Sequence, residues 1–470
     1  MSTQIVRRNL LLFGIAFMLI LMFAACAPPS PEGGGTEPAQ ATNEEGTESA
    51  VNEAAGETKA PAEAMEDVTI TWFMRWDKTR VENVAMPVIQ AFEAQHPNIH
   101  IEFENVGKSS EYYQKLQTMT AGGLAPDVFY PATHIAYAFA MKDAIRFVDD
   151  FIARDNLDMS QYDPYVLSLY QLDGLTYCLP IDTAALVVFY NKEMFDAAGV
   201  PYPQDGWTWD DFLETAKALT QDTDGDGQVD QFGVDDFTGY WPIVVWTKAG
   251  HPVFNDLRQP TEFLLTDQKS IDAIQWLADL SNVHGVMPNS EQRADIGDMF
   301  VAGKAAMKII GHWRVPRYLA NADFKFDFAP IPMGKIAANR ADGSCFAISA
   351  NSKNPEAAWE FVKFLAGPGS IGVQKLLELQ QMVPAIVEYQ SSKAFLNPPG
   401  LEGTNKGAFL AGKDHLFSNY DPLHPVYDEW KSLFKQELGE VWLGNTTAQE
   451  AVEYMAPLVD EMLANLEDYE

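Results

Sequence analysis

The chain has 470 residues, of which 47% are hydrophobic and 12% aromatic, so most of it can form globular cores. This length exceeds what one hydrophobic core normally organises, and two lobes are expected. With 32 basic and 66 acidic residues, the formal charge of −34 argues against nucleic acid and anionic lipid as partners, because both need a basic face, and favours a neutral or weakly charged ligand.

The N-terminus carries the pattern of an export signal. Two arginines (Arg7 and Arg8) precede an apolar run over residues 10–23, and Cys26 follows two small residues. Residues 1–26 resemble the signal peptide of a bacterial lipoprotein, which implies that Cys26 becomes the lipidated first residue of the mature chain. An uncleaved anchor is the alternative, although the run is shorter than the ~20 apolar residues of a comfortable membrane span.

Residues 27–66 have a different composition, rich in Pro, Gly, Glu, Ala, Thr and Ser and without any aromatic residue. Such a segment cannot bury enough apolar area to offset the entropy lost on ordering, so it is predicted to be a disordered acidic tether. No later segment has the length of a spanning helix. Attachment to the membrane would therefore be through an N-terminal lipid only.

The globular part is predicted to open with a βαβ unit. Residues 68–73 and 99–103 have the β-branched, aromatic and alternating patterns of strands, and residues 83–95 form an amphipathic helix between them. Such units build mostly parallel sheets, whose ligands lie beyond the carboxyl ends of the strands. The loop after the first strand is in such a position, and it contains Trp76, Asp77 and Arg80.

Two cysteines follow Cys26 in the sequence, Cys178 and Cys345. In an oxidising compartment they can form a disulfide or remain buried free thiols, because spacing along the chain says nothing about distance in space. No CxxC pair, HExxH motif or histidine cluster indicates a transition metal.

An acidic segment rich in glycine, residues 222–230, has the alternation of a calcium loop. Oxygen ligands at alternate positions can converge on Ca²⁺ while Gly227 provides the sharp turn. The glutamate expected at the twelfth position is absent, because Gly233 stands there, so a structural Ca²⁺ site and a solvated acidic turn both remain open. No other cofactor is expected. The calcium ligands would be Asp222, Asp224, Asp226, Gln228 and Asp230.

Several motifs in order along the chain carry a family resemblance. They are FEAQHPNIHI (92–101), APDV (125–128), YNKEMF (190–195), WTWDDF (207–212), FVAGKAAM (300–307) and SKNPEAAWEF (352–361). Together they resemble the extracellular solute-binding proteins of ABC importers, in the branch that includes maltose-binding protein. The motifs extend over nearly all of the chain after the predicted tether.

The resemblance implies an α/β periplasmic-binding-protein fold, with two discontinuous lobes, a hinge and a ligand cleft between the lobes. Chain crossings are expected near residues 181–183, 310–312 and 348–350. The N-terminal lobe would hold residues 67–182 plus 312–349, and the C-terminal lobe residues 183–311 plus 350–470.

The resemblance also implies that a sugar binds in the cleft. A sugar offers C–H faces that stack on aromatic rings, and hydroxyls that need fixed donors and acceptors. Trp313 matches an aromatic that stacks on sugar in this family, whereas Trp207 and Trp209 are expected to open a helix and Trp359 to lie in the core. The expected ligand contacts are Trp76, Asp77, Tyr130, Thr133, His134, Asp182, Tyr240, Trp241 and Trp313.

The predicted function is a lipid-anchored extracytoplasmic receptor, at the cell surface or in the periplasm, that delivers a sugar or oligosaccharide to an ABC permease. We expect a monomer that is not an enzyme and binds no nucleic acid. One alternative is another small solute, such as a polyol, glycerol phosphate or polyamine; phosphate would call for arginines or backbone amides in the cleft. A surface glycan hydrolase would instead need two carboxyl groups about 5 to 10 Å apart.

Overall fold

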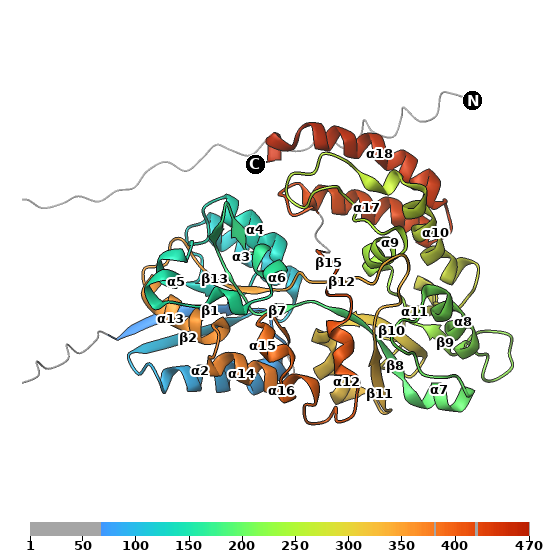
Figure 1. Ribbon diagram of the computed structural model, residues 1–470, viewed down its shortest axis with the longest axis horizontal. Coiled ribbons are helices and arrows are strands. Elements are labelled where there is room, and N and C mark those ends of the chain that lie inside the picture. Colours follow the sequence, from blue (N-terminus) through green and yellow to red (C-terminus); the bar gives the residue numbers. More distant parts are fainter. Residues whose placement is uncertain (1–66, 380–381, 419–421, 470) are drawn as a thin grey trace, which may run out of the picture. The chain divides into compact units, whose positions relative to one another are not determined.

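The computed structural model describes residues 67–379, 382–418 and 422–469. The predicted signal peptide, Cys26 and the predicted tether over residues 27–66 lie outside these residues. Within the described ranges, no helix is both long and apolar enough to cross a bilayer. Two mixed sheets, each packed between helices, organise the described chain (Figure 1).

The first sheet has five strands in the order β2-β1-β3-β13-β6. β1 pairs in parallel with both β2 and β3, which confirms the predicted βαβ unit, whereas β13 runs antiparallel to β3 and β6. The strands are β1 (Val68–Met74), β2 (Ile99–Asn105), β3 (Val128–Phe129), β6 (Leu179–Pro180) and β13 (Cys345–Ile348).

Alternation along β1 places large side chains on both faces of this sheet. The ring of Trp72 lies 5.1 Å from that of Phe361, whereas the next residue, Phe73, stacks on Tyr112 at 4.6 Å on the opposite face. The Trp72 face is covered by α2 (Met86–Glu93), α13 (Pro355–Ala366) and α14 (Ile371–Glu378), and the other by α3 (Ser109–Ala121) and α4 (Thr133–Met141) (Figure 1). Trp359 of α13 is fully buried, as predicted.

The second sheet has four strands in the order β11-β8-β10-β9. β8 is antiparallel to β10 and β11, and β10 is parallel to β9. All six residues of β8 are buried, because this strand is covered on both faces. The strands are β8 (Leu186–Asn191), β9 (Phe232–Val234), β10 (Ala305–Gly311) and β11 (Phe326–Ala329).

Helices of the second lobe surround this sheet. Trp209 is the first residue of α8, where Thr208 and Asp211 form a capping box, so the predicted role of Trp209 at the start of a helix is confirmed. The helices are α7 (Lys192–Ala198), α8 (Trp209–Leu219), α9 (Trp241–Ala249), α10 (Gln268–Asn282), α11 (Ser290–Arg293), α12 (Val315–Asn321), α17 (Tyr427–Trp442) and α18 (Ala448–Ala464).

Short elements complete the fold. The helix predicted over residues 83–95 begins as a π-helical turn, η1, that continues directly into α2. The remaining helical turns are α1 (Lys78–Arg80), η1 (Val81–Ala85), α5 (Asp149–Asp155), η2 (Met159–Gln161), α6 (Pro164–Ser168), η3 (Thr238–Tyr240), η4 (Leu264–Thr266), η5 (His312–Arg314), α15 (Val387–Gln390), α16 (Lys393–Leu396), η6 (Lys406–Leu410) and η7 (Leu466–Tyr469). The remaining strands are β4 (Gln171–Leu172), β5 (Leu175–Thr176), β7 (Asp182–Thr183), β12 (Asn339–Arg340), β14 (Val383–Pro384) and β15 (Leu416–Phe417).

The chain passes between the two sheets three times, and two of these crossings differ from the prediction. The first joins β6 to β8 through residues 181–185. After residue 312 the chain remains with the second sheet, because β11 pairs with β8, so the second crossing falls between β11 and β13. Likewise α13 and α14 pack against the first sheet, and the third crossing falls between α16 and η6. The predicted lobe boundaries at 312–349 and 350–470 are corrected accordingly.

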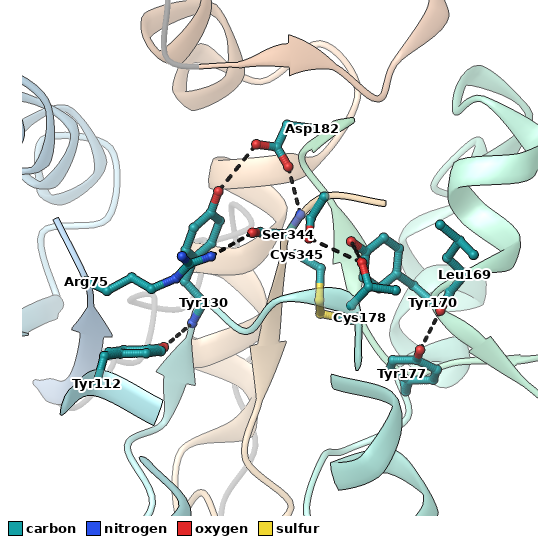
Figure 2. The surroundings of a disulfide bond; sticks show 12 residues. Arg75, Tyr112, Tyr130, Leu169, Tyr170, Tyr177, Cys178, Asp182, Ser344 and Cys345 are labelled. Carbon is teal, nitrogen blue, oxygen red and sulfur yellow. Dashed lines mark hydrogen bonds between the residues drawn. A yellow bond between two sulfur atoms is a disulfide. The ribbon is translucent and has the colours of Figure 1, made fainter. Parts of the chain in front are cut away.

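A disulfide joins Cys178 and Cys345, whose Cα atoms are 5.8 Å apart (Figure 2). Cys178 directly precedes β6, and Cys345 begins β13, the neighbouring strand. Of the two states that the sequence left open, the structure contains the bonded one. The bond ties together the segments that carry the first and second crossings.

Candidate functional site

A cavity of about 500 Å³ lies at the carboxyl ends of the parallel strands of the first sheet. Its walls come from the loops after β1, β2 and β3, from the first and second crossings, and from the segment η5–α12 of the second lobe. The volume falls within the usual range of small-molecule sites. The cavity therefore lies between the lobes, where a ligand can contact both of them.

The loop after β1 is held in place by reciprocal hydrogen bonds. The backbone N–H of Trp76 donates to Oδ1 of Asn105 at 2.8 Å, and Nδ2 of Asn105 donates to the Trp76 carbonyl at 2.7 Å. The Trp76 ring then packs edge-on against Tyr130, with centroids 6.4 Å apart. Asp77 caps α1 by accepting from the backbone N–H of Arg80 at 2.9 Å. These contacts fix one aromatic wall of the cavity.

The opposite wall depends on a glycine. The Trp313 ring lies directly over Gly311, where an added Cβ would come within 1.8 Å of Cζ3 of the ring. Nη2 of Arg80 donates to the Trp313 carbonyl at 2.8 Å, a contact that joins the first lobe to the second. The guanidinium of Arg340 lies 5.6 Å from the Trp313 ring centroid.

A polar network, which Figure 2 shows beside the disulfide, lines the cavity. Asp182 accepts from the backbone N–H of Ser344 at 2.8 Å and from the Tyr130 hydroxyl at 3.4 Å. Nη2 of Arg75 donates to Oγ of Ser344 at 3.0 Å, and its guanidinium lies 5.2 Å from the Tyr130 ring centroid. Burial raises the pKa of Asp182 to about 6, although the Ser344 N–H and Arg75 oppose this rise.

The structure brings five of the nine predicted ligand residues to this one cavity. They come from four segments far apart in the sequence, and the expectation that they bind ligand stays a prediction. They are Trp76, Asp77, Tyr130, Asp182 and Trp313.

The other four lie elsewhere. Thr133 is fully buried and donates to the Gly343 carbonyl at 3.2 Å, and His134 packs between the rings of Tyr113 and Tyr427, where burial lowers its pKa to about 3. Tyr240 packs beside Trp313, with ring centroids 6.5 Å apart. Trp241 lines a second cavity, of about 440 Å³, between α9 and α17.

Arginines line the first cavity in a way that the sequence prediction did not anticipate. Of these arginines, the sequence pattern places only Arg80 near a ligand, in the loop after the first strand. A local signal was nevertheless present, because Arg314 directly follows the predicted sugar-stacking Trp313 and Arg317 lies one helical turn further on. The arginines that line the cavity are Arg75, Arg80, Arg314, Arg317 and Arg340.

The acidic segment predicted to bind calcium forms an exposed loop between α8 and β9. Carboxylate oxygens of Asp222, Asp224 and Asp226 lie within 4.8 Å of one another. Asp230 instead accepts from both the backbone N–H and the hydroxyl of Thr223, each at 2.8 Å, and Nε2 of Gln228 donates to Asp226 at 3.2 Å. Three of the five predicted ligands are thus brought together.

Two α/β lobes joined by three crossings, with a cavity between them, define a binding protein of the periplasmic type. Residues 77–371 match the family of bacterial extracellular solute-binding proteins, and the chain belongs to that family. Its members are receptors that bind solutes and are not enzymes. The resemblance inferred from the sequence motifs is therefore confirmed.

Two solved structures with this fold and one relative found by sequence illustrate the ligands of similar proteins. An ABC substrate-binding protein of Listeria monocytogenes in complex with cycloalternan has a TM-score of 0.75 and 22% identity, covering 86% of this chain and 100% of that one. UgpB of Mycobacterium tuberculosis, in complex with glycerophosphocholine, has a TM-score of 0.69 and 19% identity, covering 85% and 98%. A maltotriose-binding protein of Pyrococcus abyssi is 22% identical over 333 residues, 68% of this chain and 67% of the relative.

Proposed function

We propose that this chain is the receptor of an ABC importer and captures a sugar or oligosaccharide in the cavity between its lobes. The observation that supports this most directly is the presence of three aromatic residues, Trp76, Tyr130 and Trp313, around one cavity with fixed polar groups. The rings suit the C–H faces of a sugar, and the polar groups suit its hydroxyls. The relatives that bind maltotriose and cycloalternan support the same ligand class.

Binding would be coupled to rotation of the lobes about the three crossings. A ligand that contacts both walls stabilises the closed arrangement only by as much as it prefers that arrangement to the open one. The closed receptor would then be recognised by the permease and release its ligand chemically unaltered. Hydrolysis of ATP would belong to a partner subunit.

The proposal includes a lipid anchor on Cys26, which would keep a monomeric receptor at the outer side of the cytoplasmic membrane. Expression of the full chain in a bacterial host should yield a membrane-bound protein whose N-terminal peptide carries lipid by mass spectrometry. Cys26→Ser should abolish the lipid. An unmodified Cys26 in the membrane-bound protein would contradict this part of the proposal.

The ligand can be tested by isothermal titration calorimetry against a carbohydrate library, together with small-angle scattering. We expect at least one sugar to bind with measurable heat, to compact the protein and to be recovered intact. If no member produces heat or a change in scattering, the sugar receptor function is wrong. Recovery of shortened products would instead indicate the glycan hydrolase. Mass spectrometry of ligand that co-purifies provides an independent identification.

A further inference from the structure

The cavity of the proposed receptor is lined by positively charged side chains, although the protein as a whole is acidic. Residues 67–470 contain nine arginines, and five of them line this cavity. No lysine is found among its described lining residues, and only two carboxylates are, Asp77 and Asp182. The cavity therefore has the opposite sign of charge to the chain, whose formal charge is −34.

Three of these arginines have an acidic neighbour, because Arg75 interacts electrostatically with Asp182. Nε of Arg340 lies 2.9 Å from each carboxylate oxygen of the buried Asp342, and Nε of Arg80 lies 3.8 Å from Asp77. Asp182 interacts with Ser344 and Tyr130 by hydrogen bonds and with Arg75 by charge. The excess of positive charge is consequently greatest around Arg314 and Arg317.

Arg314 and Arg317 lie on the wall formed by the second lobe. They are three residues apart along η5 and α12, so their side chains emerge on the same side, and both line the cavity. Within the described chain, Nε of Arg314 is buried without a hydrogen-bond partner. A buried donor in this state is costly, and an acceptor on a ligand would relieve the cost.

We propose that the ligand is an anionic carbohydrate whose carboxylate, phosphate or sulfate group is bound by Arg314 and Arg317, with Arg75 on the opposite wall. This inference rests on the proposed function and narrows its ligand class. The planar guanidinium forms two parallel hydrogen bonds to such groups, which a neutral hydroxyl cannot match. Trp313, which is partly exposed, remains available to stack on the sugar ring.

The charge also explains how ligand would favour closure. Arg75 and Arg80 belong to the first lobe, and Arg314 and Arg317 to the second. Like charges on facing walls repel when the lobes approach, and an anion placed between them replaces that repulsion with attraction to both walls. The anionic group thus supplies a preference for the closed state, which binding must have in order to shift the equilibrium.

Matched pairs of ligands test the inference by calorimetry on the purified protein. The probes are glucuronate and glucose 6-phosphate against glucose, digalacturonate against galactobiose, and N-acetylglucosamine 6-sulfate against N-acetylglucosamine. We expect at least one anionic member to bind at least about tenfold more tightly than its neutral partner. Its affinity should fall as NaCl is raised, because the interaction is screened.

Charge-removing variants locate the effect. Arg314→Gln and Arg317→Gln should each lower the affinity for the anionic ligand by about tenfold. The affinity for the neutral ligand of the same pair should change by no more than about twofold. Arg146→Gln is the matched control, because Arg146 pairs with Asp150 on the surface of the first lobe and should change neither affinity. Unchanged melting temperatures would show that the cavity variants remain folded.

The outcomes separate this inference from the proposed function. Neutral sugars that bind as tightly as their anionic partners would overturn the inference and leave the sugar receptor standing. The inference would also be overturned if Arg314→Gln lowered the affinities for the anionic and the neutral ligand of a pair equally. Inorganic phosphate that competes as well as glucose 6-phosphate would support an anion site but contradict the sugar part of the proposed function.

Discussion

The position of Trp313 illustrates how one glycine can determine a binding surface. Because Gly311 has no Cβ, the indole ring can fold back over the end of β10 and form a wall of the cavity. Gly343 also lacks room for a side chain, because an added Cβ would come within 2.3 Å of the Asp182 carbonyl oxygen. Both glycines therefore allow a neighbouring group of the site to pack closely against the backbone.

Trp313→Ala should weaken binding of the cognate sugar by at least about tenfold, because a stacking face is lost, while the fold is retained. Gly311→Ala should have a similar effect by displacing the ring. Calorimetry with the ligand found in the library measures both. Trp241→Ala is the comparison, since Trp241 lines the second cavity. Unchanged affinity in Trp313→Ala would show that this residue does not contact the ligand. Affinity that is lost only in Trp241→Ala would show that the ligand binds in the second cavity.

Asp182 should make stability depend on pH. Its pKa is raised by burial from 3.8 to about 6, against the opposing effects of Ser344, Arg75, Tyr130 and Arg340. Between these values the folded state binds a proton that the unfolded state does not, so the free energy of unfolding falls as pH rises, by up to about 1.4 kcal/mol per pH unit.

Asp182→Asn removes this titration and keeps an oxygen that can accept from Ser344. The free energy of unfolding of the variant, minus that of the wild type, should therefore increase from about pH 4 to pH 6 and then level off. Urea denaturation across this range measures it. Parallel pH profiles for the two proteins would show that the carboxyl has no raised pKa.

At the scale of elements, the disulfide connects two strands whose chain continues into the crossings. β6 leads to the first crossing and β13 receives the second, and their cysteines are separated by 167 residues in the sequence. A crosslink over so long a loop restricts the unfolded chain strongly. The bond also limits how far these two segments can move apart during rotation of the lobes.

The double variant Cys178→Ala/Cys345→Ala should lower the free energy of unfolding by about 2 to 5 kcal/mol. Denaturant titration measures the change, and the wild type treated with a reductant serves as the control and should behave similarly. Equal stability of the variant and the oxidised wild type would contradict the expectation.

The acidic loop between α8 and β9 can be tested separately. If Asp222, Asp224 and Asp226 bind Ca²⁺, millimolar Ca²⁺ should raise the melting temperature, and Mg²⁺ should do so less because it prefers a stricter octahedral geometry. Asp224→Asn should reduce the shift. A melting temperature that does not respond to Ca²⁺ would identify the loop as a solvated acidic turn.

At the scale of the whole described chain, a second-lobe arginine reaches the first lobe outside the crossings. Arg258, in the loop between α9 and α10, donates to the Ser168 carbonyl at the end of α6 and lies 5.5 Å from the Tyr137 ring centroid. These contacts would favour an arrangement with the lobes close together. They provide a way to change lobe closure without altering the cavity.

Arg258→Ala should shift the ligand-free protein toward a more open state, seen as a larger radius of gyration in small-angle scattering. Ligand affinity should fall severalfold, because a smaller fraction of the receptor is then ready to close. Arg154→Ala, which changes an exposed arginine paired with Asp155 within the first lobe, is the control. Identical scattering of Arg258→Ala and wild type would exclude this role.

Local sequence patterns predicted the parts of this protein that depend on neighbouring residues. The alternation of residues 68–73 predicted β1, Trp209 was expected to open a helix and begins α8, and Trp359, predicted to be a core residue, is buried. The family could also be inferred, because its motifs are continuous segments. These features arise from contacts within a few residues, so the order of amino acids alone was sufficient.

Only the tertiary structure decided which residues share the cavity and where the lobes divide. Arg75 donates a hydrogen bond to Ser344, which is 269 residues away in the sequence, and Arg80 donates one to Trp313, 233 residues away. The pairing of β11 with β8 keeps residues 326–329 in the second sheet, against the prediction. The whole-chain charge likewise gave no sign of the arginine-lined cavity, because net charge counts residues without their positions. Contacts between distant segments depend on the packing of complete lobes, which no local pattern contains.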